Sequence, residues 1–232
     1  MERTVRALYA MHGRIRCAVM SEQTDHYFTA EPASAAERRT LDVTLAGHRV
    51  QVQTAPGVFC PDRLDVGTAV LLEHVPAPPA TGAVLDLGCG WGPIAMALGL
   101  LSPQASVWAV DVNQRALDLA RHTAAAVGLA DFHACTPEEV PADLTFAAIW
   151  SNPPIRVGKA VLHDMLLTWL PRLAGGGTAY LVVQKNLGSD SLQRWLDAEL
   201  AGRFPGQFSV ARHASARTFR VLSVTRAVHD HR

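Results

Sequence analysis

The sequence predicts an α/β fold in which a mostly parallel, seven-stranded sheet is covered by helices on both faces. Short apolar runs alternate with longer helix-like segments from about residue 81 onward, and this alternation is typical of parallel sheets. A glycine-rich turn joins the first apolar run to the first helix, which is how nucleotide-binding α/β units begin. Before residue 81, two runs that alternate apolar and polar residues predict a β-hairpin appendage.

The overall composition is that of a globular protein with a sizeable core. Hydrophobic residues make up 49% of the 232 residues and charged residues 18%, which excludes wholesale disorder. The formal net charge is zero, so the molecule as a whole is not an electrostatic binder of nucleic acid. Arginines gather near the two ends of the chain, where basic surface suits RNA.

The cysteines and the apolar runs indicate the compartment. The cysteines form no C-x-x-C pair, which argues against a metal site and a disulfide scaffold; they are Cys17, Cys60, Cys89 and Cys135. No apolar run reaches the roughly 18 residues of a membrane span. The N-terminus also lacks the continuous apolar segment of a secretory signal. We therefore expect a cytoplasmic protein with no metal and no membrane partner.

The first eighty residues are expected to form an appendage in two parts. Residues 1–30 are interpreted as an N-terminal extension, within which Met20 is a plausible start. Residues 31–80 hold the hairpin and a linker. Two strands, a short helix and a proline-rich stretch are expected there, over Leu41–Leu45, Arg49–Gln53, Thr68–Val75 and Pro76–Pro79.

Residues 81–227 are expected to form the main domain, followed by a tail at residues 228–232. Its strands are predicted over Ala83–Asp86, Ser106–Val110, Phe132–Cys135, Phe146–Trp150, Thr178–Val183, Phe208–Val210 and Thr218–Val224. Its helices are predicted over Ile94–Leu101, Gln114–Val127, Lys159–Leu173 and Ser189–Leu200. Gly128 and the glycines at 175–177 are expected to end the helices that precede them.

The glycine-rich turn reads AVLDLGCGWGP over Ala83–Pro93. Glycine at positions 88 and 90 lets the backbone approach a ligand where a Cβ would collide with it. A dinucleotide site asks for G-x-G-x-x-G, but here the third glycine comes one place early and Pro93 takes the last position. Asp86 ends the strand before the turn and is placed to meet an amino group, such as the methionine end of S-adenosylmethionine.

Asp111 follows the second strand, 23 residues after Gly88. A carboxylate at this position accepts hydrogen bonds from both ribose hydroxyls in nucleotide-binding α/β folds. The alternative is that Asp111 caps the helix over Gln114–Val127, a role that Asn113 fits equally well. Both Asp86 and Asp111 end apolar strands at the edge where α/β ligands bind, which favours the binding role.

A second motif, Ser151-Asn-Pro-Pro-Ile155, follows the fourth predicted strand. Proline has no N–H and holds the preceding residue extended, so this turn is rigid. The side-chain oxygen of Asn152 and the carbonyl of Pro153 then converge on one amino group. A planar exocyclic amine fits this arrangement, because two acceptors align its weakly nucleophilic nitrogen without a strong base.

Together these two motifs resemble the class I S-adenosylmethionine-dependent methyltransferases, and more closely the small-domain family that contains the bacterial 16S ribosomal RNA guanine-N2 methyltransferases. Segments outside the motifs also read as family segments, among them Pro56–Phe59, Leu64–Gly67 and Phe219–Leu222. The resemblance spans about residues 26–226. It implies a Rossmann-like fold, S-adenosylmethionine as cofactor, and ribosomal RNA or the small ribosomal subunit as partner.

The resemblance also implies roles for single residues. Asn152 and Pro153 would hold the target amine, with Pro154 and Ile155 against the base. The residues implied to bind or close over the cofactor are Phe59, Asp65, Gly67, Asp86, Gly88, Gly90, Asp111 and Asn152. The family usually has Asn or Asp after the third strand to meet the adenine amine, and this chain offers only Thr136 there. Arg156 and Lys159 follow the turn and are expected to meet RNA phosphates.

The predicted function is therefore N-methylation of the exocyclic N2 amine of a guanine in ribosomal RNA. One alternative keeps the chemistry and changes the acceptor to a protein glutamine amide or a small amine. Ile155 counts against the glutamine, because those enzymes usually carry an aromatic residue after the two prolines. A second alternative is a non-catalytic module that binds an adenosine ligand or RNA, which would have no need of the Asn-Pro-Pro turn.

Overall fold

Seven strands form the central sheet of the computed structural model, which describes residues 37–228. Their order across the sheet is β5 (Phe132–Cys135), β4 (Gln104–Val110), β3 (Thr81–Leu87), β6 (Phe146–Ser151), β7 (Leu173–Gln184), β9 (Phe219–Arg226) and β8 (Phe208–Ala216). The first five are parallel to one another, and β9 and β8 pair antiparallel at one side. The predicted Rossmann-like fold with a mostly parallel seven-stranded sheet is confirmed.

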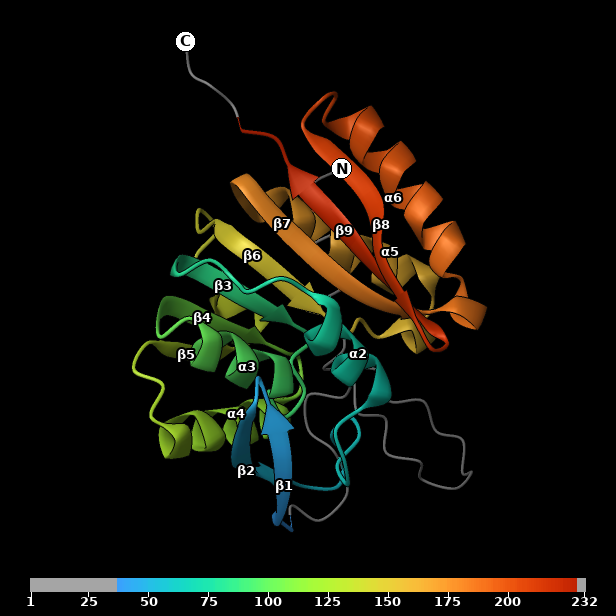
Figure 1. The fold of residues 1–232 in the computed structure, drawn as a ribbon. Coiled ribbons are helices and arrows are strands. Elements are labelled where there is room, and N and C mark those ends of the chain that lie inside the picture. The colour runs from blue at the N-terminus through green and yellow to red at the C-terminus, as the bar shows by residue number, and fades with distance from the viewer. Residues whose placement is uncertain (1–36, 229–232) are drawn as a thin grey trace, which may run out of the picture.

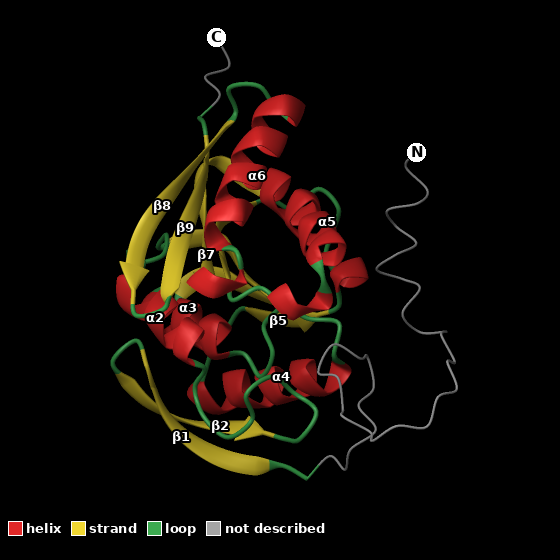
Figure 2. Ribbon diagram, turned by 90° about the vertical axis from the view of Figure 1, so that its right-hand side faces the viewer, coloured by secondary structure: helices red, strands yellow, loops and turns green. Residues whose placement is uncertain are grey.

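Helices cover both faces of this sheet (Figures 1 and 2). The helices are α2 (Val66–His74), α3 (Pro93–Leu101), α4 (Gln114–Val127), α5 (Lys159–Trp169) and α6 (Ser189–Arg203). One core cluster packs α3 and α4 against one face, and a second packs α5 and α6 against the other. Successive residues of a strand point to opposite faces of the sheet. Val84 therefore belongs to the first cluster and Leu85 to the second.

The predicted hairpin is confirmed as a separate two-stranded sheet, β1 (Arg39–Leu45) and β2 (His48–Thr54). Its turn places Ala46 and Gly47 at φ values of 50° and 80°, the backbone of a tight hairpin turn. Leu45, Val50 and Val52 are buried in the same core cluster as α3 and α4. The hairpin thus lies against the outside of α4, as Figure 2 shows.

The sheet changes its winding direction at β3. The chain passes from β3 to β4 and β5 on one side, and then returns to β6 on the other side of β3. In α/β sheets, the crevice at such a point, beyond the carboxyl ends of the strands, is where ligands bind. The turns after β3, β4 and β6 carry the glycine loop, Asp111 and the Asn-Pro-Pro turn, which therefore meet at one edge.

Several predicted boundaries are wrong, among them the end of β8, which is Ala216 rather than Val210. Helix α5 ends at Trp169 rather than Leu173, because Pro171 cannot donate the next helical hydrogen bond. The glycines at 175–177 lie inside β7 and do not end a helix. A Cβ on Gly177 would lie 3.0 Å from the carbonyl oxygens of Phe146 and Ala147, so this glycine lets β7 pass close to β6.

The predicted extension over residues 1–30, the first part of the predicted segment over residues 31–80, and nearly all of the tail at residues 228–232 lie outside the described residues. Within residues 37–228, no helix combines the length and the apolar character that crossing a membrane requires.

Candidate functional site

The glycine loop is held against the end of β4 by its own backbone. The N–H groups of Gly88 and Cys89 both donate to the carbonyl of Val110, at 2.8 and 3.0 Å. Gly88 and Gly90 adopt φ values of 75° and 54°, which residues with a Cβ rarely reach. The loop therefore turns tightly and leaves its backbone open to a ligand.

Asp86 lies fully buried at the end of β3, beneath this loop. One carboxyl oxygen, Oδ2, accepts a hydrogen bond from Ala95 N in the first turn of α3 at 2.9 Å. The other, Oδ1, has no hydrogen-bond partner among the described residues. Burial raises the pKa of Asp86 well above its ordinary value, and the nearby charge of Asp111 raises it further. A cationic group beside Oδ1 would relieve this cost.

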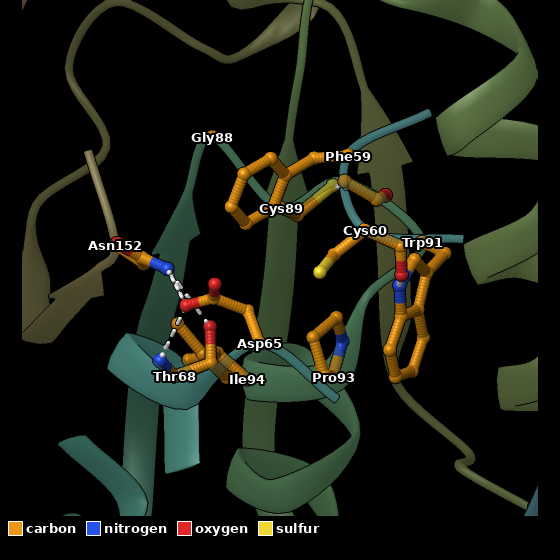
Figure 3. A pocket seen from close by; sticks show the side chains of 11 residues that line it. Phe59, Cys60, Asp65, Thr68, Gly88, Cys89, Trp91, Pro93, Ile94 and Asn152 are labelled. Atoms are coloured by element: carbon orange, nitrogen blue, oxygen red, sulfur yellow. Dashed lines mark hydrogen bonds between the residues drawn. The ribbon is translucent and has the colours of Figure 1, made fainter. Parts of the chain in front are cut away.

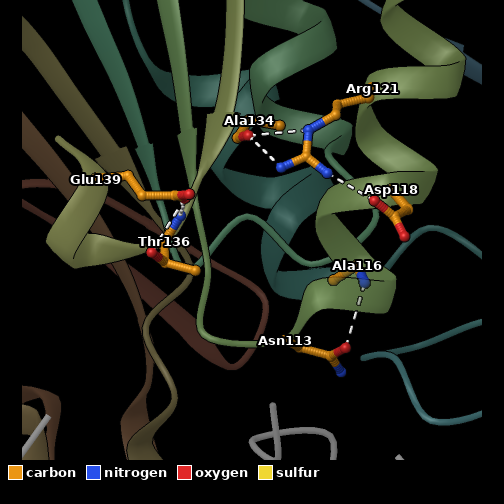
Figure 4. A network of polar contacts seen from close by, with 7 residues as sticks. All are labelled: Asn113, Ala116, Asp118, Arg121, Ala134, Thr136 and Glu139. Atoms are coloured by element: carbon orange, nitrogen blue, oxygen red, sulfur yellow. Dashed lines mark hydrogen bonds and ion pairs between the residues drawn. The ribbon is translucent and has the colours of Figure 1, made fainter. Parts of the chain in front are cut away.

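Asp111 organises the loop from the end of β4. Its Oδ2 accepts from Gly90 N at 2.8 Å, and its Oδ1 accepts from Asn113 N at 2.9 Å. Burial raises the pKa of Asp111, and the backbone hydrogen bonds oppose that rise. Asn113 is the N-cap of α4 and accepts from Ala116 N, as Figure 4 shows. The alternative assignment of Asp111 as that cap is therefore wrong, and its remaining lone pairs can accept from a ligand.

The loop before α2 is anchored over the glycine loop. Asn113 Nδ2 donates to Gly57 O at 2.8 Å, and Arg115 Nη1 donates to Pro56 O at 2.6 Å. Trp91 Nε1 donates to Cys60 O at 3.2 Å. These three bonds place Phe59, which is 37% exposed, beside Gly90.

A pocket opens between these segments (Figure 3). Its walls come from the loop before α2, from the glycine loop with the start of α3, and from the turn after β6. The lining residues are Phe59, Cys60, Asp65, Thr68, Gly88, Cys89, Gly90, Trp91, Pro93, Ile94 and Asn152. Five of the residues predicted to bind the cofactor are thus brought together: Phe59, Asp65, Gly88, Gly90 and Asn152.

The Asn-Pro-Pro turn is fixed on both sides. Ser151 Oγ donates to Leu87 O at 2.6 Å, which ties the end of β6 to the end of β3. Asn152 Nδ2 donates to Asp65 Oδ2 at 2.8 Å and to Thr68 Oγ1 at 3.1 Å. The amide nitrogen of Asn152 thus has two acceptors, one a carboxylate and one a hydroxyl. Its Oδ1 is thereby left as the acceptor of the side chain.

Gly67 stands close behind this contact. A Cβ on Gly67 would lie 2.9 Å from Asp65 Oδ2 and 3.0 Å from the ring of Phe219. A Cβ at these distances would force the Asp65 carboxylate and the Phe219 ring to shift, so Gly67 permits close packing here. Its predicted part in closing over the cofactor stays a prediction. Phe219, at the start of β9, thus borders the same position from another element.

The carbonyl of Pro153 already accepts one hydrogen bond within the turn, which the proline pair does not predict. Ile155 N donates to Pro153 O at 2.9 Å, so one of its two lone pairs is engaged. Pro153 is buried and Pro154 half-buried. Ile155 packs partly against the second core cluster at the start of a short 3₁₀ turn, Ile155–Val157.

Thr136 lies apart from the pocket, in a capping box with Glu139 (Figure 4). Its N–H and Oγ1 both donate to Glu139 Oε2, at 2.7 and 3.1 Å. These bonds lower the pKa of Glu139. The structure therefore does not bring Thr136 among the lining residues, and its role toward adenine stays a prediction.

The predicted RNA-facing cations lie beside the turn after β6. Arg156 and Lys159 are exposed, Arg156 in the 3₁₀ turn and Lys159 as the first residue of α5. Lys185 Nζ donates to Arg217 O at 2.9 Å, near the hairpin between β8 and β9. Arg220 is paired with Asp190 and offers less to a phosphate. Within residues 37–228, no cluster of His, Cys, Asp and Glu is arranged to hold a metal ion.

The sequence motifs do not single out three residues that the structure places at the site: Thr68, Ser151 and Trp91. The spacing of Asp65 and Thr68 is that of a helix N-cap and its third residue. That signal was available, because a predicted helix begins at this point. Nothing in the sequence indicates that Trp91 reaches Cys60, since the two residues belong to different segments.

A comparison with protein families finds one that matches most of the chain. The model of the methyltransferase small domain family matches residues 49–221. The uncharacterized protein YbxB of Bacillus subtilis is 30% identical over 171 residues, which cover 72% of this chain and 85% of that protein.

Two curated relatives are named for ribosomal RNA. Ribosomal RNA small subunit methyltransferase C of Ectopseudomonas mendocina is 38% identical over 200 residues, 81% of this chain and 59% of that protein. Ribosomal RNA large subunit methyltransferase G of Streptomyces coelicolor is 34% identical over 166 residues, 68% of this chain and 44% of that protein. The match thus spans 59% of the length of the first relative and 44% of the length of the second.

The same fold recurs among solved structures. A T. thermophilus 16S rRNA N2 methyltransferase, in complex with AdoMet and guanosine, matches with a TM-score of 0.66 at 23% identity. The match covers 85% of this chain and 53% of that chain. A methyltransferase from Pyrococcus furiosus matches with a TM-score of 0.60 at 16% identity, over 78% of this chain and 90% of that one.

The buried carboxylate of Asp86 predicts how stability changes with pH. Its folded pKa lies above the ordinary value of 3.8, so the folded protein binds this proton more tightly than the unfolded chain. Stability therefore falls as pH rises from about 4 through the raised pKa. Asp86→Asn carries no charge, so the ligand-free variant should melt higher than the parent at about pH 8, with a smaller difference at about pH 5.

The measurement is thermal unfolding across this pH range, with Asp62→Asn as the control. Asp62 is exposed, so its replacement should give no comparable trend. A variant at position 86 that melts lower than the parent at about pH 8 would show that the folded protein compensates the charge of Asp86.

Proposed function

This chain belongs to the methyltransferase small domain family, and we propose that it methylates the exocyclic N2 amine of a guanine in ribosomal RNA. Methyltransferases of this family use S-adenosylmethionine. The observation that carries the proposal is the amide of Asn152, whose donor end is engaged and whose acceptor end is left for an amine. Because the chain spans only part of the curated ribosomal RNA relatives, its activity and substrate are inferences.

The residues that line the pocket and the two carboxylates beside the glycine loop fit the cofactor. Asp86 offers a buried oxygen without a partner, which suits the amino group of the methionine end. Gly88 and Gly90 have no side chains, so a ligand can approach the backbone of the loop. Asp111, directly after β4, is placed to accept hydrogen bonds from ribose hydroxyls. Phe59 and the loop before α2 would cover the ligand from the other side. When bound, S-adenosylmethionine supplies a sulfonium methyl group as the electrophile.

Asn152 and Pro153 act on the acceptor rather than on the methyl group. The lone pair of an exocyclic amine is delocalised into its ring, so the nitrogen is a weak nucleophile. Two carbonyl oxygens that accept its hydrogens hold the lone pair in line for attack. As the methyl group passes to the nitrogen, the N–C bond would form while the S–C bond breaks and S-adenosylhomocysteine leaves; the nitrogen gains positive charge, which these same oxygens stabilise. The product loses one proton to water, so no strong base is needed.

Guanine is favoured over the alternative acceptors by the relatives. The T. thermophilus neighbour is named as a 16S rRNA N2 methyltransferase and binds guanosine in its structure. The curated relatives are named for ribosomal RNA of the small or the large subunit. The small subunit is the proposed target, and the relative named for the large subunit supports a second candidate there. Ile155 counts against a protein glutamine, and the engaged amide of Asn152 counts against a non-catalytic module.

The experiment that tests the function is nucleoside mass spectrometry after reaction of purified protein with S-adenosylmethionine. Ribosomal RNA of the two subunits would be supplied separately, both naked and as assembled particles. The proposal expects N2-methylguanosine, formed mainly in small-subunit RNA. Methyl groups found only on cytosine, on adenine or on a protein would overturn the acceptor and leave the cofactor in place.

Replacing Asn152 with Ala should separate chemistry from cofactor binding. The variant loses one of two acceptors that stabilise the developing charge, so kcat should fall by about 10²-fold or more. The dissociation constant of S-adenosylhomocysteine, measured by calorimetry, should change little. A variant that loses cofactor affinity and keeps its rate at saturation would place Asn152 in the cofactor site alone.

Arg156→Ala and Lys159→Ala should weaken RNA binding without changing cofactor affinity. Each removes one contact to a phosphate, so the slope of log K against log[salt] should fall by about 1. Arg203→Ala is the matched control, because Arg203 ends α6 and pairs with Glu199. Equal losses for all three variants would mean that the turn after β6 does not contact RNA.

A further inference from the structure

Asp65 joins two separate features of the site through one oxygen atom. Its Oδ2 accepts from Thr68 N at 3.0 Å, which caps helix α2. The same oxygen accepts from Asn152 Nδ2 at 2.8 Å, across 87 positions of sequence. Figure 3 shows the carboxylate of Asp65 bonded to both Asn152 and Thr68, which line the pocket with it. The residue therefore holds the start of α2 and the turn after β6 together.

We propose that Asp65 is a positioning residue that sets the amide of Asn152, and that it acts on methyl transfer through Asn152 rather than through the cofactor. The resemblance to known enzymes predicts instead that Asp65 closes over the cofactor. The catalytic part of this inference rests on the proposed function, because it assumes that Asn152 receives the acceptor amine.

The chemistry of the two side chains gives the reason. An amide has a donor end and an acceptor end, and a half-turn of the side chain exchanges them. A carboxylate only accepts, so Nδ2 of Asn152 must face Asp65. The exchanged orientation would bring the amide oxygen against the carboxylate and leave Oδ2 short of a donor. The charge of Asp65 thus selects the orientation in which Asn152 Oδ1 points away from α2.

Thr68 and Gly67 support the same orientation. Thr68 Oγ1 accepts from Asn152 Nδ2 at 3.1 Å, and Thr68 is itself buried. Gly67 has no Cβ, so Asn152 and Asp65 can approach each other there. A hydrogen bond between a neutral donor and a charged acceptor is stronger than one between two neutral groups. Asn152 thereby keeps its orientation before any acceptor arrives.

Asp65→Ser is the variant that isolates this contact. Serine caps a helix about as well as aspartate, but its shorter, uncharged side chain cannot hold Asn152 Nδ2. We expect kcat to fall by about tenfold or more, as for the loss of one hydrogen bond to a charged group. The dissociation constant of S-adenosylhomocysteine should stay within about twofold of the parent, which a simple loss of pocket structure would not allow. Asp62→Ser is the matched control, because Asp62 is an exposed carboxylate of the same loop that does not line the pocket.

The decisive comparison repeats Asp65→Ser in a chain that already carries Asn152→Ala. If Asp65 acts only through Asn152, the second substitution should leave kcat unchanged in that background. The inference is overturned if kcat falls by the same factor in both backgrounds, or if Asp65→Ser raises the dissociation constant of the cofactor by about tenfold or more.

A stability cycle makes the inference independent of the substrate. The melting temperatures of the parent, the two single variants and the double variant report whether positions 65 and 152 interact. If the double variant melts higher than the sum of the two single losses predicts, the contact is supported. If the losses are strictly additive, the inference is overturned. If the parent methylates no guanine, the proposed function fails, and this cycle still decides whether Asp65 holds Asn152.

Discussion

The parallel register of β3, β4 and β6 is the constraint on which the whole site depends. Asp86 in β3 lies level with Ala109 in β4 and Trp150 in β6, so the three strands end together. Two hydrogen bonds lock these ends: Gly88 N to Val110 O, and Ser151 Oγ to Leu87 O. Because the register is fixed, the glycine loop, the carboxylate after β4 and the Asn-Pro-Pro turn face one another without further adjustment.

The site is assembled at a cost to the stability of the ligand-free protein. Asp86 is a buried carboxylate and Asp111 a half-buried one, both with raised pKa values, and the loop between them needs glycines at positive φ. Such features persist only where the surrounding structure determines them. The two packed core clusters and the tie of Asn113 to Gly57 supply that support. Ligand binding would then offset a cost already present in the fold.

The sequence predicts the parts of the site that local pattern controls. Alternating strands and helices gave the sheet, and the glycine turn and the two prolines marked two of its three loops. Asn113 follows from capping preference and is confirmed as the N-cap of α4. The predicted end of helix α5 is wrong, because Pro171 stops the helix before the glycines that follow it.

Contacts between distant segments were beyond prediction. Asp65 and Asn152 lie 87 positions apart, and only the packing of α2 against the sheet edge brings them together. Thr136 is a local case: its hydroxyl donates to Glu139 three residues on, and its contact with the adenine stays a prediction. Pro153 O accepts from Ile155 N, which depends on the 3₁₀ turn that follows the prolines and not on the prolines themselves.

The most direct test is a crystal structure of the protein with S-adenosylhomocysteine and guanosine. We expect the exocyclic amine of guanosine at about 2.7–3.2 Å from Asn152 Oδ1, with Asn152 Nδ2 still bonded to Asp65. A guanosine whose amine contacts other groups, or an Asn152 amide that turns away from Asp65 when the ligands bind, would contradict the proposed role of Asn152.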